Sequence, residues 1–81
     1  MKCMLITPFS TKTYDVVWLE AQTDQGSFII KKGHAPTMLV LSSNKELIIR
    51  LKDGKQETIM VPHGILDITR EELTVVIQEN R

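Results

Sequence analysis

The apolar residues of this chain come in short runs that are broken every few positions by turn-forming residues. The runs are rich in Val, Ile, Leu and Thr, and apolar residues recur at a spacing of two. Such runs are typical of β-strands, because successive side chains alternate between the two faces of a sheet and β-branched side chains fit its pleated surface. No segment keeps a 3.6-residue period for long enough to predict a helix, and residues 69–72 have room for a single turn. This feature predicts an all-β chain.

We expect about eight strands, separated by Gly, Pro, Asn, Asp and Ser turn signals. They are predicted at residues 2–7, 14–22, 26–31, 37–41, 46–52, 55–61, 64–68 and 73–78. About eight to ten short antiparallel strands in a chain of 81 residues predict a two-sheet β-sandwich or flattened barrel. The length allows one domain, which covers residues 1–81.

The clearest single turn signal is Asp53-Gly54. Asp-Gly between alternating strands is typical of a two-residue type I′ turn, and such a turn sets the register of its hairpin. Counting outward pairs Leu51 with Gln56, Arg50 with Glu57, Ile49 with Thr58, Ile48 with Ile59 and Leu47 with Met60. The inward face then carries four apolar residues, Leu47, Ile49, Leu51 and Met60. Ile48 and Ile59 are expected on the outer face.

A second stretch, residues 25–36, places two glycines, a histidine and a proline around a short apolar run. Gly33 is suited to a positive φ, and Pro36 disfavours the helical region for Ala35. We therefore expect a strand that turns sharply at Gly33-His34 and resumes near Met38. The pattern indicates a shaped loop.

Composition narrows the classes of partner. Ten Lys and Arg balance ten Asp and Glu, so the chain shows no electrostatic footprint for nucleic acid or an anionic membrane. The single Cys3 cannot form an internal disulfide, which fits a reducing compartment. The longest apolar runs have four or five residues, far too few to span a bilayer, and the N-terminus lacks a signal-peptide pattern. Membrane association is expected only through a partner.

Residues that could support catalysis are few. The only histidines, His34 and His63, are each predicted in turns, and no Cys or carboxylate has the spacing of a metal site. No Gly-rich phosphate-binding loop precedes a helix. We expect no metal, no cofactor and no catalysis by this chain alone. Trp18, in the run 16–19, is equally consistent with a covered side chain and with an interface anchor.

Three stretches in the same order resemble the epsilon subunit of F-type ATP synthases, called delta in mitochondria. Gly33-His34-Ala35-Pro36 is similar to that family's Gly-His-Ala-Pro turn, and Ile6-Thr7-Pro8 to its first strand and loop. Residues 64–68 followed by 73–77 resemble its final hairpin. The likeness spans nearly the whole chain and covers the family's N-terminal β domain.

The chain also departs from the family pattern. Ser27, Ile29 and Lys32 stand where the family usually has Glu, Gly and Pro, and His63-Gly64 stands where Gly-Gly is frequent. These differences leave the predicted fold unchanged and affect the details of partner contact.

The resemblance implies a non-catalytic rotor subunit at the foot of the central stalk, with the gamma subunit and the c-ring as partners. The complex couples ion flow to ATP synthesis or hydrolysis. By position, the implied gamma or c-ring contacts are Ser27, Lys31, Lys32, Gly33, His34 and Ala35. Ser27 stands where an acidic residue faces the ring, so this contact would lose its charge. The implied location is the cytoplasmic face of a membrane, most simply a bacterial one.

Two other hypotheses stay open: a free-standing β-sandwich binding module unrelated to ATP synthase, and a small enzyme that uses His34 or His63. Longer members of the resembled family carry two mobile C-terminal helices, and some bind ATP. Here only Glu79, Asn80 and Arg81 follow the last predicted strand. We therefore expect a constitutive coupling subunit that neither inhibits itself nor binds ATP.

Overall fold

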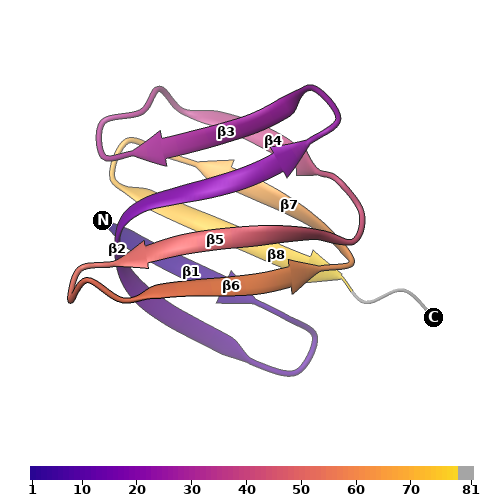
Figure 1. The fold of residues 1–81 in the computed structure, drawn as a ribbon, viewed down its shortest axis with the longest axis horizontal. Coiled ribbons are helices and arrows are strands. Elements are labelled where there is room, and N and C mark those ends of the chain that lie inside the picture. Colours follow the sequence, from indigo (N-terminus) through magenta and orange to yellow (C-terminus); the bar gives the residue numbers. More distant parts are fainter. Residues whose placement is uncertain (79–81) are drawn as a thin grey trace.

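The computed structural model describes residues 1–78, which form eight β-strands (Figure 1). They are β1 (Lys2–Ile6), β2 (Thr11–Thr23), β3 (Gly26–Lys31), β4 (Thr37–Leu41), β5 (Lys45–Leu51), β6 (Gln56–Val61), β7 (His63–Ile68) and β8 (Glu72–Gln78). The predicted all-β class is confirmed, and every predicted strand has a counterpart within three residues at either end. The expectation drawn from residues 79–81 lies outside the described range.

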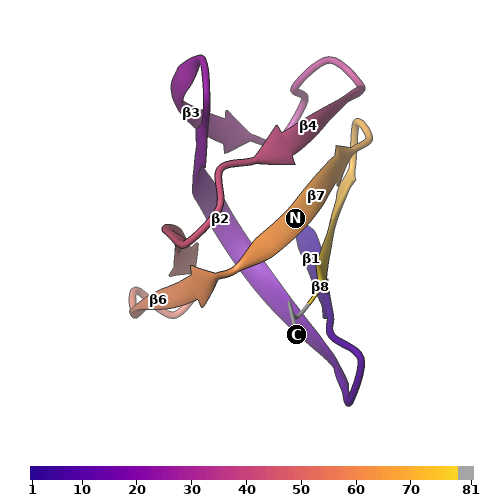
Figure 2. The ribbon, with the colours of Figure 1, turned by 90° about the vertical axis from the view of Figure 1, so that its right-hand side faces the viewer.

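The strands form two layers that share β2 (Figure 2). Sheet A has the order β4-β7-β8-β1-β2, and sheet B has the order β3-β2-β5-β6. The first half of β2 pairs with β1, and its second half pairs with β3 and β5. Among the described strands every pairing is antiparallel, as expected, except that of β1 with β8, which is parallel. The predicted two-sheet sandwich is therefore confirmed, with one parallel pair inside it.

A β-bulge at Val17 marks the point where β2 leaves sheet A and enters sheet B. Val16 pairs with Leu51, but the next pairing joins Trp18 to Arg50, so Val17 is the extra residue. Bulges bend a strand and increase its twist, which suits a strand that must turn from one layer into the other. Strict alternation fails here: Val16 and Leu19 are buried, while Val17 is exposed and Trp18 is half-buried.

The core lies between the sheets and consists of apolar residues contributed by all eight strands. Its buried members are Cys3, Leu5, Val16, Leu19, Ala21, Ile30, Leu41, Leu47, Ile49, Val61, Leu66, Ile68, Leu73, Val75 and Ile77. No polar or charged residue is buried among residues 1–78. Because a single small core supports the domain, each of its larger side chains contributes a substantial share of the stability.

The connection between β5 and β6 has three residues instead of the predicted two. The Gly54 amide donates to the Leu51 carbonyl over 3.0 Å, and the Leu51 amide donates to the Lys55 carbonyl over 2.7 Å. This is a type I turn followed by a glycine bulge, and the φ of 96° at Gly54 is the left-handed conformation that the bulge requires. The Asp53 carboxylate accepts a hydrogen bond from the Lys55 amide and closes the turn.

The longer turn shifts the hairpin register by one residue. The observed pairs are Arg50 with Gln56, Ile49 with Glu57, Ile48 with Thr58, Leu47 with Ile59 and Glu46 with Met60. The predicted inward position of Met60 is therefore wrong, since Met60 is 59% exposed, and Ile59 packs against the core instead. The Arg50–Glu57 pair does not form. The physical reason is that the observed register turns both Ile59 and Val61 inward, whereas the predicted one buries Met60 alone.

Candidate partner interface

The loop between β3 and β4 contains four of the six residues for which partner contacts were predicted, and a fifth, Lys31, is the last residue of β3 just before it. The loop backbone forms a tight turn in which the His34 amide donates to the Lys31 carbonyl over 3.1 Å. Gly33 has a φ of 86°, so Lys31 to His34 form a type II turn with glycine at its third position. The predicted positive φ at Gly33 is confirmed, and the loop has a defined shape.

Two further hydrogen bonds hold this loop. The Gly33 amide donates to the Arg70 carbonyl in the β7–β8 connection over 3.2 Å, which ties the end of β3 in sheet B to sheet A. The Nδ1 atom of half-buried His34 lies 2.9 Å from the Ala35 carbonyl oxygen. The imidazole therefore hydrogen-bonds to the backbone of its own loop, and the exposed side chains of Lys31 and Lys32 are the charged groups beside it.

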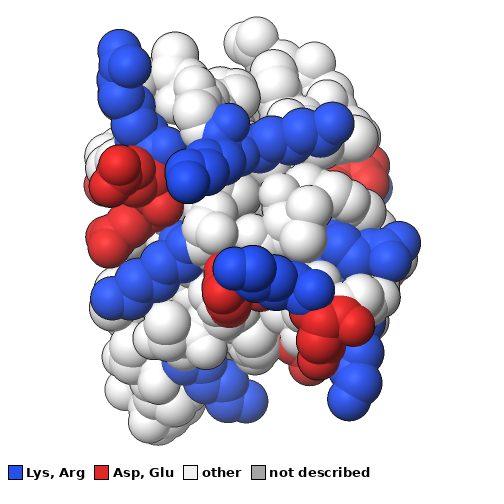
Figure 3. Space-filling view, turned by 90° about the vertical axis from the view of Figure 1, so that its left-hand side faces the viewer, with Lys and Arg blue, Asp and Glu red and all other residues white. Residues whose placement is uncertain are grey.

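The end of the domain that carries this loop mixes charges of both signs. Figure 3 views this end and shows Lys and Arg side chains standing beside Asp and Glu side chains. Mixed charge gives no broad field of one sign, so recognition here depends on individual contacts.

Ser27 lies at the other end of β3 and is not brought together with the loop. It occupies the second position of the strand, beside the β2–β3 turn, and its hydroxyl donates to the Gln22 side-chain carbonyl over 2.7 Å. Ser27 and Lys31 share the outer face of sheet B but are four residues apart, about 13 Å along an extended strand. The six predicted contact residues therefore form two separate regions.

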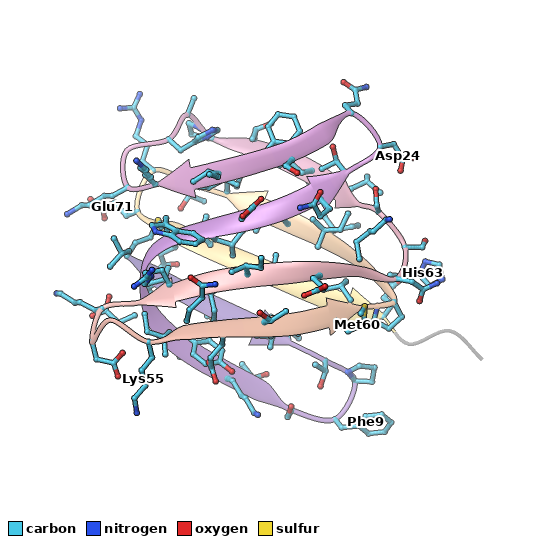
Figure 4. All side chains as sticks on the ribbon, viewed as in Figure 1. Phe9, Asp24, Lys55, Met60, His63 and Glu71 are labelled. Carbon is cyan, nitrogen blue, oxygen red and sulfur yellow. The ribbon has the colours of Figure 1, made fainter. Side chains whose placement is uncertain are left out.

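His63 lies in a second polar group, on the same side of the domain as Asp24 of the β2–β3 turn (Figure 4). Its Nδ1 atom is 3.0 Å from the Ser43 hydroxyl, and the neighbouring Ser42 hydroxyl donates to the Asp24 carboxylate over 2.8 Å. These residues border an open hollow of about 300 Å³. Within residues 1–78 no group of three or more His, Cys, Asp or Glu side chains is placed to hold a metal ion.

Cys3 is enclosed by the core, and burial raises the pKa of its thiol to about 11. A thiol with so high a pKa stays protonated near neutral pH and does not act as a nucleophile. Burial also raises the pKa of Tyr14, and the negative charge of Glu57 adds to the effect. Neither group has the lowered pKa of an activated catalytic residue.

A groove of about 380 Å³, which the sequence did not predict, lies between the β2–β3 turn and β4. Phe28 lies on the inner face of β3, and Leu39 lies on the inner face of β4. These two edge strands face each other without forming strand pairing between the sheets. Phe28 and Leu39 border the groove together with Thr23, Asp24, Gln25, Met38 and Val40. No sequence signal marks this groove, because it depends on which two strands become the free edges of the sheets.

A family model, ATP synthase, Delta/Epsilon chain, beta-sandwich domain, matches residues 1–80. The chain belongs to this family. Its membership confirms the resemblance seen in the Gly33 to Pro36 turn and in the first and last strands. No curated protein sequence gives a significant match.

Chains in solved structures of two ATP synthases have the same fold. A chain in the cryo-EM structure of the Tetrahymena thermophila mitochondrial ATP synthase, central stalk and c-ring, superimposes with a TM-score of 0.83 at 16% identity. A chain in that of the Euglena gracilis mitochondrial ATP synthase, which contains OSCP, F1 and the c-ring, does so with a TM-score of 0.84 at 17% identity. These matches cover 98% and 93% of the present chain, which spans 63% and 48% of the two longer chains.

Proposed function

We propose that this delta/epsilon domain is a non-catalytic rotor subunit of an F-type ATP synthase, linking the gamma subunit to the c-ring. The observation that carries the proposal is the family match over residues 1–80. In this role the domain transmits torque and supports the coupling of ion translocation to ATP synthesis or hydrolysis. It reaches the membrane through the complex, at the cytoplasmic face in a bacterium.

The architecture is that of a rigid domain, which suits a subunit that transmits torque. Two sheets enclose one apolar core, and the Gly33–Arg70 and Ser42–Gln22 backbone hydrogen bonds join segments of opposite sheets. Close-packed protein interiors have low compressibility and transmit strain. Two contact regions at opposite ends of β3, one at Ser27 and one at the loop of Lys31, Lys32, Gly33, His34 and Ala35, allow simultaneous contact with two partners.

The experiment is a pull-down of the tagged chain from native membranes, followed by identification of the captured subunits. Capture of gamma together with c subunits supports the proposal. A chain that captures neither, although it is folded and abundant, contradicts it and favours a free-standing binding module. Titration with ATP is expected to give no heat of binding, and a saturable heat would contradict the predicted absence of regulation by ATP.

A further inference from the structure

A cross-strand row on the outer face of sheet B joins two cations through the single tryptophan of the chain. Lys31 of β3 pairs with Trp18 of β2, Trp18 pairs with Arg50 of β5, and Arg50 pairs with Gln56 of β6. At the usual strand spacing the backbones of Lys31 and Arg50 are about 10 Å apart, with the indole between them. The Arg50 guanidinium carbon lies 5.8 Å from the centroid of the Trp18 ring. The row therefore places an aromatic ring between two positive charges.

Neither cation is neutralised by a salt bridge within residues 1–78. The salt bridges there join Asp15 to the Met1 amino group and to Lys52. The Nη1 atom of Arg50 donates to the Gly54 carbonyl oxygen over 3.0 Å, whereas its Nε atom is buried and has no hydrogen-bond partner in the described structure. A buried donor without an acceptor is unfavourable and rare in native proteins. The guanidinium therefore lacks an acceptor that another molecule can supply.

We propose that Lys31, Trp18 and Arg50 form a docking site for an acidic segment of another protein. The two cations hold carboxylates of the segment, the planar guanidinium donates hydrogen bonds as a fork, and an apolar side chain packs against the indole. Trp and Arg are also enriched among the residues that dominate binding at protein interfaces. The site goes beyond the proposed function and does not depend on it.

The neighbouring row on the same face determines how such a segment lies. Two residues further along each strand, Glu20 stands between Ile29 and Ile48. An acidic segment that ran along the strands would meet the Glu20 carboxylate within about 7 Å, so the segment crosses the strands along the cationic row. Alternate side chains of an extended segment point the same way and are about 7 Å apart. Two of them can therefore reach Lys31 and Arg50.

Three other occupants fit the surface less well. An anionic lipid surface would also cover Glu20 and Glu46, which cancel the charges of Lys31 and Arg50 over the face as a whole. A stable contact with a second copy buries about 800 Å² on each partner, whereas four strands of about six residues have an outer face on the order of 400 Å². A nucleotide polyphosphate is usually held by free backbone amides of a loop or helix end, and the amides of this row belong to paired strands.

The test uses the fluorescence of Trp18, which reports on this site alone because the chain has one tryptophan. The probe is a soluble peptide in which glutamate alternates with leucine, and the control peptide has glutamine in place of glutamate. Lys31→Gln and Arg50→Gln each remove one cation of the row. Lys12→Gln, the matched control, removes an exposed lysine from the part of β2 that pairs with β1. Circular dichroism checks that the variants are folded, and Lys31→Gln alone serves if Arg50→Gln is not.

We expect the glutamate peptide to give a saturable change in Trp18 emission. Its dissociation constant should rise about fivefold or more in Lys31→Gln and in Arg50→Gln, and less than about twofold in Lys12→Gln. Arg50→Lys should bind more tightly than Arg50→Gln but less tightly than the unmodified chain, because it keeps the charge and loses the fork.

Two results would overturn the inference directly: no saturable response to the glutamate peptide, or an equal response to the glutamine peptide. A stronger response to ATP, or to vesicles that contain phosphatidylserine, would assign another class of ligand and overturn it as well. None of these results bears on the proposed function, which the pull-down from native membranes tests separately.

Discussion

The outer faces of the two sheets differ in how their apolar side chains are separated. On sheet A one row is apolar throughout: Val40, Ile65, Val76 and Ile6. On sheet B the apolar residues alternate with charged ones: Ile29 pairs with Glu20, and Met60 pairs with Glu46. The largest outer side chain of sheet B, Trp18, is half-buried, and the Arg50 guanidinium carbon lies 5.8 Å from its ring centroid.

This difference shows that the register across strands decides whether outward apolar side chains form a continuous surface. Along each strand, apolar residues point outward on both sheets. Only on sheet A does strand pairing align them, whereas on sheet B charged residues separate them. On sheet B the exposed apolar residues, such as Ile29 and Met60, therefore stand singly, whereas on sheet A they form one continuous row.

The largest expected effect tests whether the inner faces of the two sheets contribute equally to the core, although their outer faces differ. Leu66, in sheet A, and Ile49, in sheet B, are both buried in the shared core. Each of Leu66→Ala and Ile49→Ala should lower the free energy of unfolding by about 2–5 kcal/mol, because each leaves a cavity. Denaturant unfolding measures both. A cost at Ile49 near that of an exposed residue would show that sheet B does not share the core.

The next effect concerns the turn that links the two sheets. Gly33→Val places a β-branched residue at a φ of 86° and should cost about 1–3 kcal/mol through backbone strain. Space is not the cause, because a Cβ atom at Gly33 meets nothing within 4 Å. Lys32→Val, at the preceding position of the turn, is the matched control. Equal costs for the two variants would remove the turn conformation as the reason.

A smaller effect compares a charged residue on the outer face of each sheet. Arg50→Ala should destabilise the isolated domain by about 0.5–1 kcal/mol, since it removes the cation–π contact and uncovers Trp18. Asp67→Ala should change stability by less than about 0.5 kcal/mol, because the described structure gives this carboxylate no ion pair. Thermal unfolding of both variants compares them. If Asp67→Ala proved the more harmful, the outer face of sheet A would be stabilised internally.

The smallest effect is a pH dependence at the edge of sheet A. The pKa of Asp15 lies below its ordinary value of 3.8, chiefly because the Met1 amino group donates a hydrogen bond to it over 3.2 Å, with Lys52 adding to the shift. The Asp15 carboxylate therefore binds a proton less tightly in the folded state than in the unfolded state. As a result, the ionised carboxylate stabilises the fold above pH 3.8, and this contribution is lost as the pH falls through the folded-state pKa. Asp15→Asn should therefore lower the unfolding temperature slightly near neutral pH and leave it unchanged in strong acid. A constant difference at all pH values would exclude the ion pair as the cause.

Part of the candidate interface could be predicted from the sequence. The turn at Gly33 followed from glycine chemistry and from the proline after Ala35, both local signals. The separation of Ser27 from that turn follows from the extended strand between them, which was predicted at residues 26–31. The hydrogen bond of Gly33 to Arg70 depends on a segment that is distant in the sequence. The apolar row was missed because its four members lie on four different strands, and each is unremarkable within its own strand.

The sequence by itself determined where the strands lie, because the alternation of side chains and the turn residues act within a few positions of one another. It also determined the family, through short motifs around Gly33 and Pro8. The tertiary structure alone decided the parallel pairing of β1 with β8, the bulge at Val17 and the three-residue turn that moved Met60 outward. The physical reason is that burial depends on contacts between strands. The longer turn places both Ile59 and Val61 against the core, and the free energy of burying them outweighs the local preference of Asp53-Gly54 for a two-residue turn.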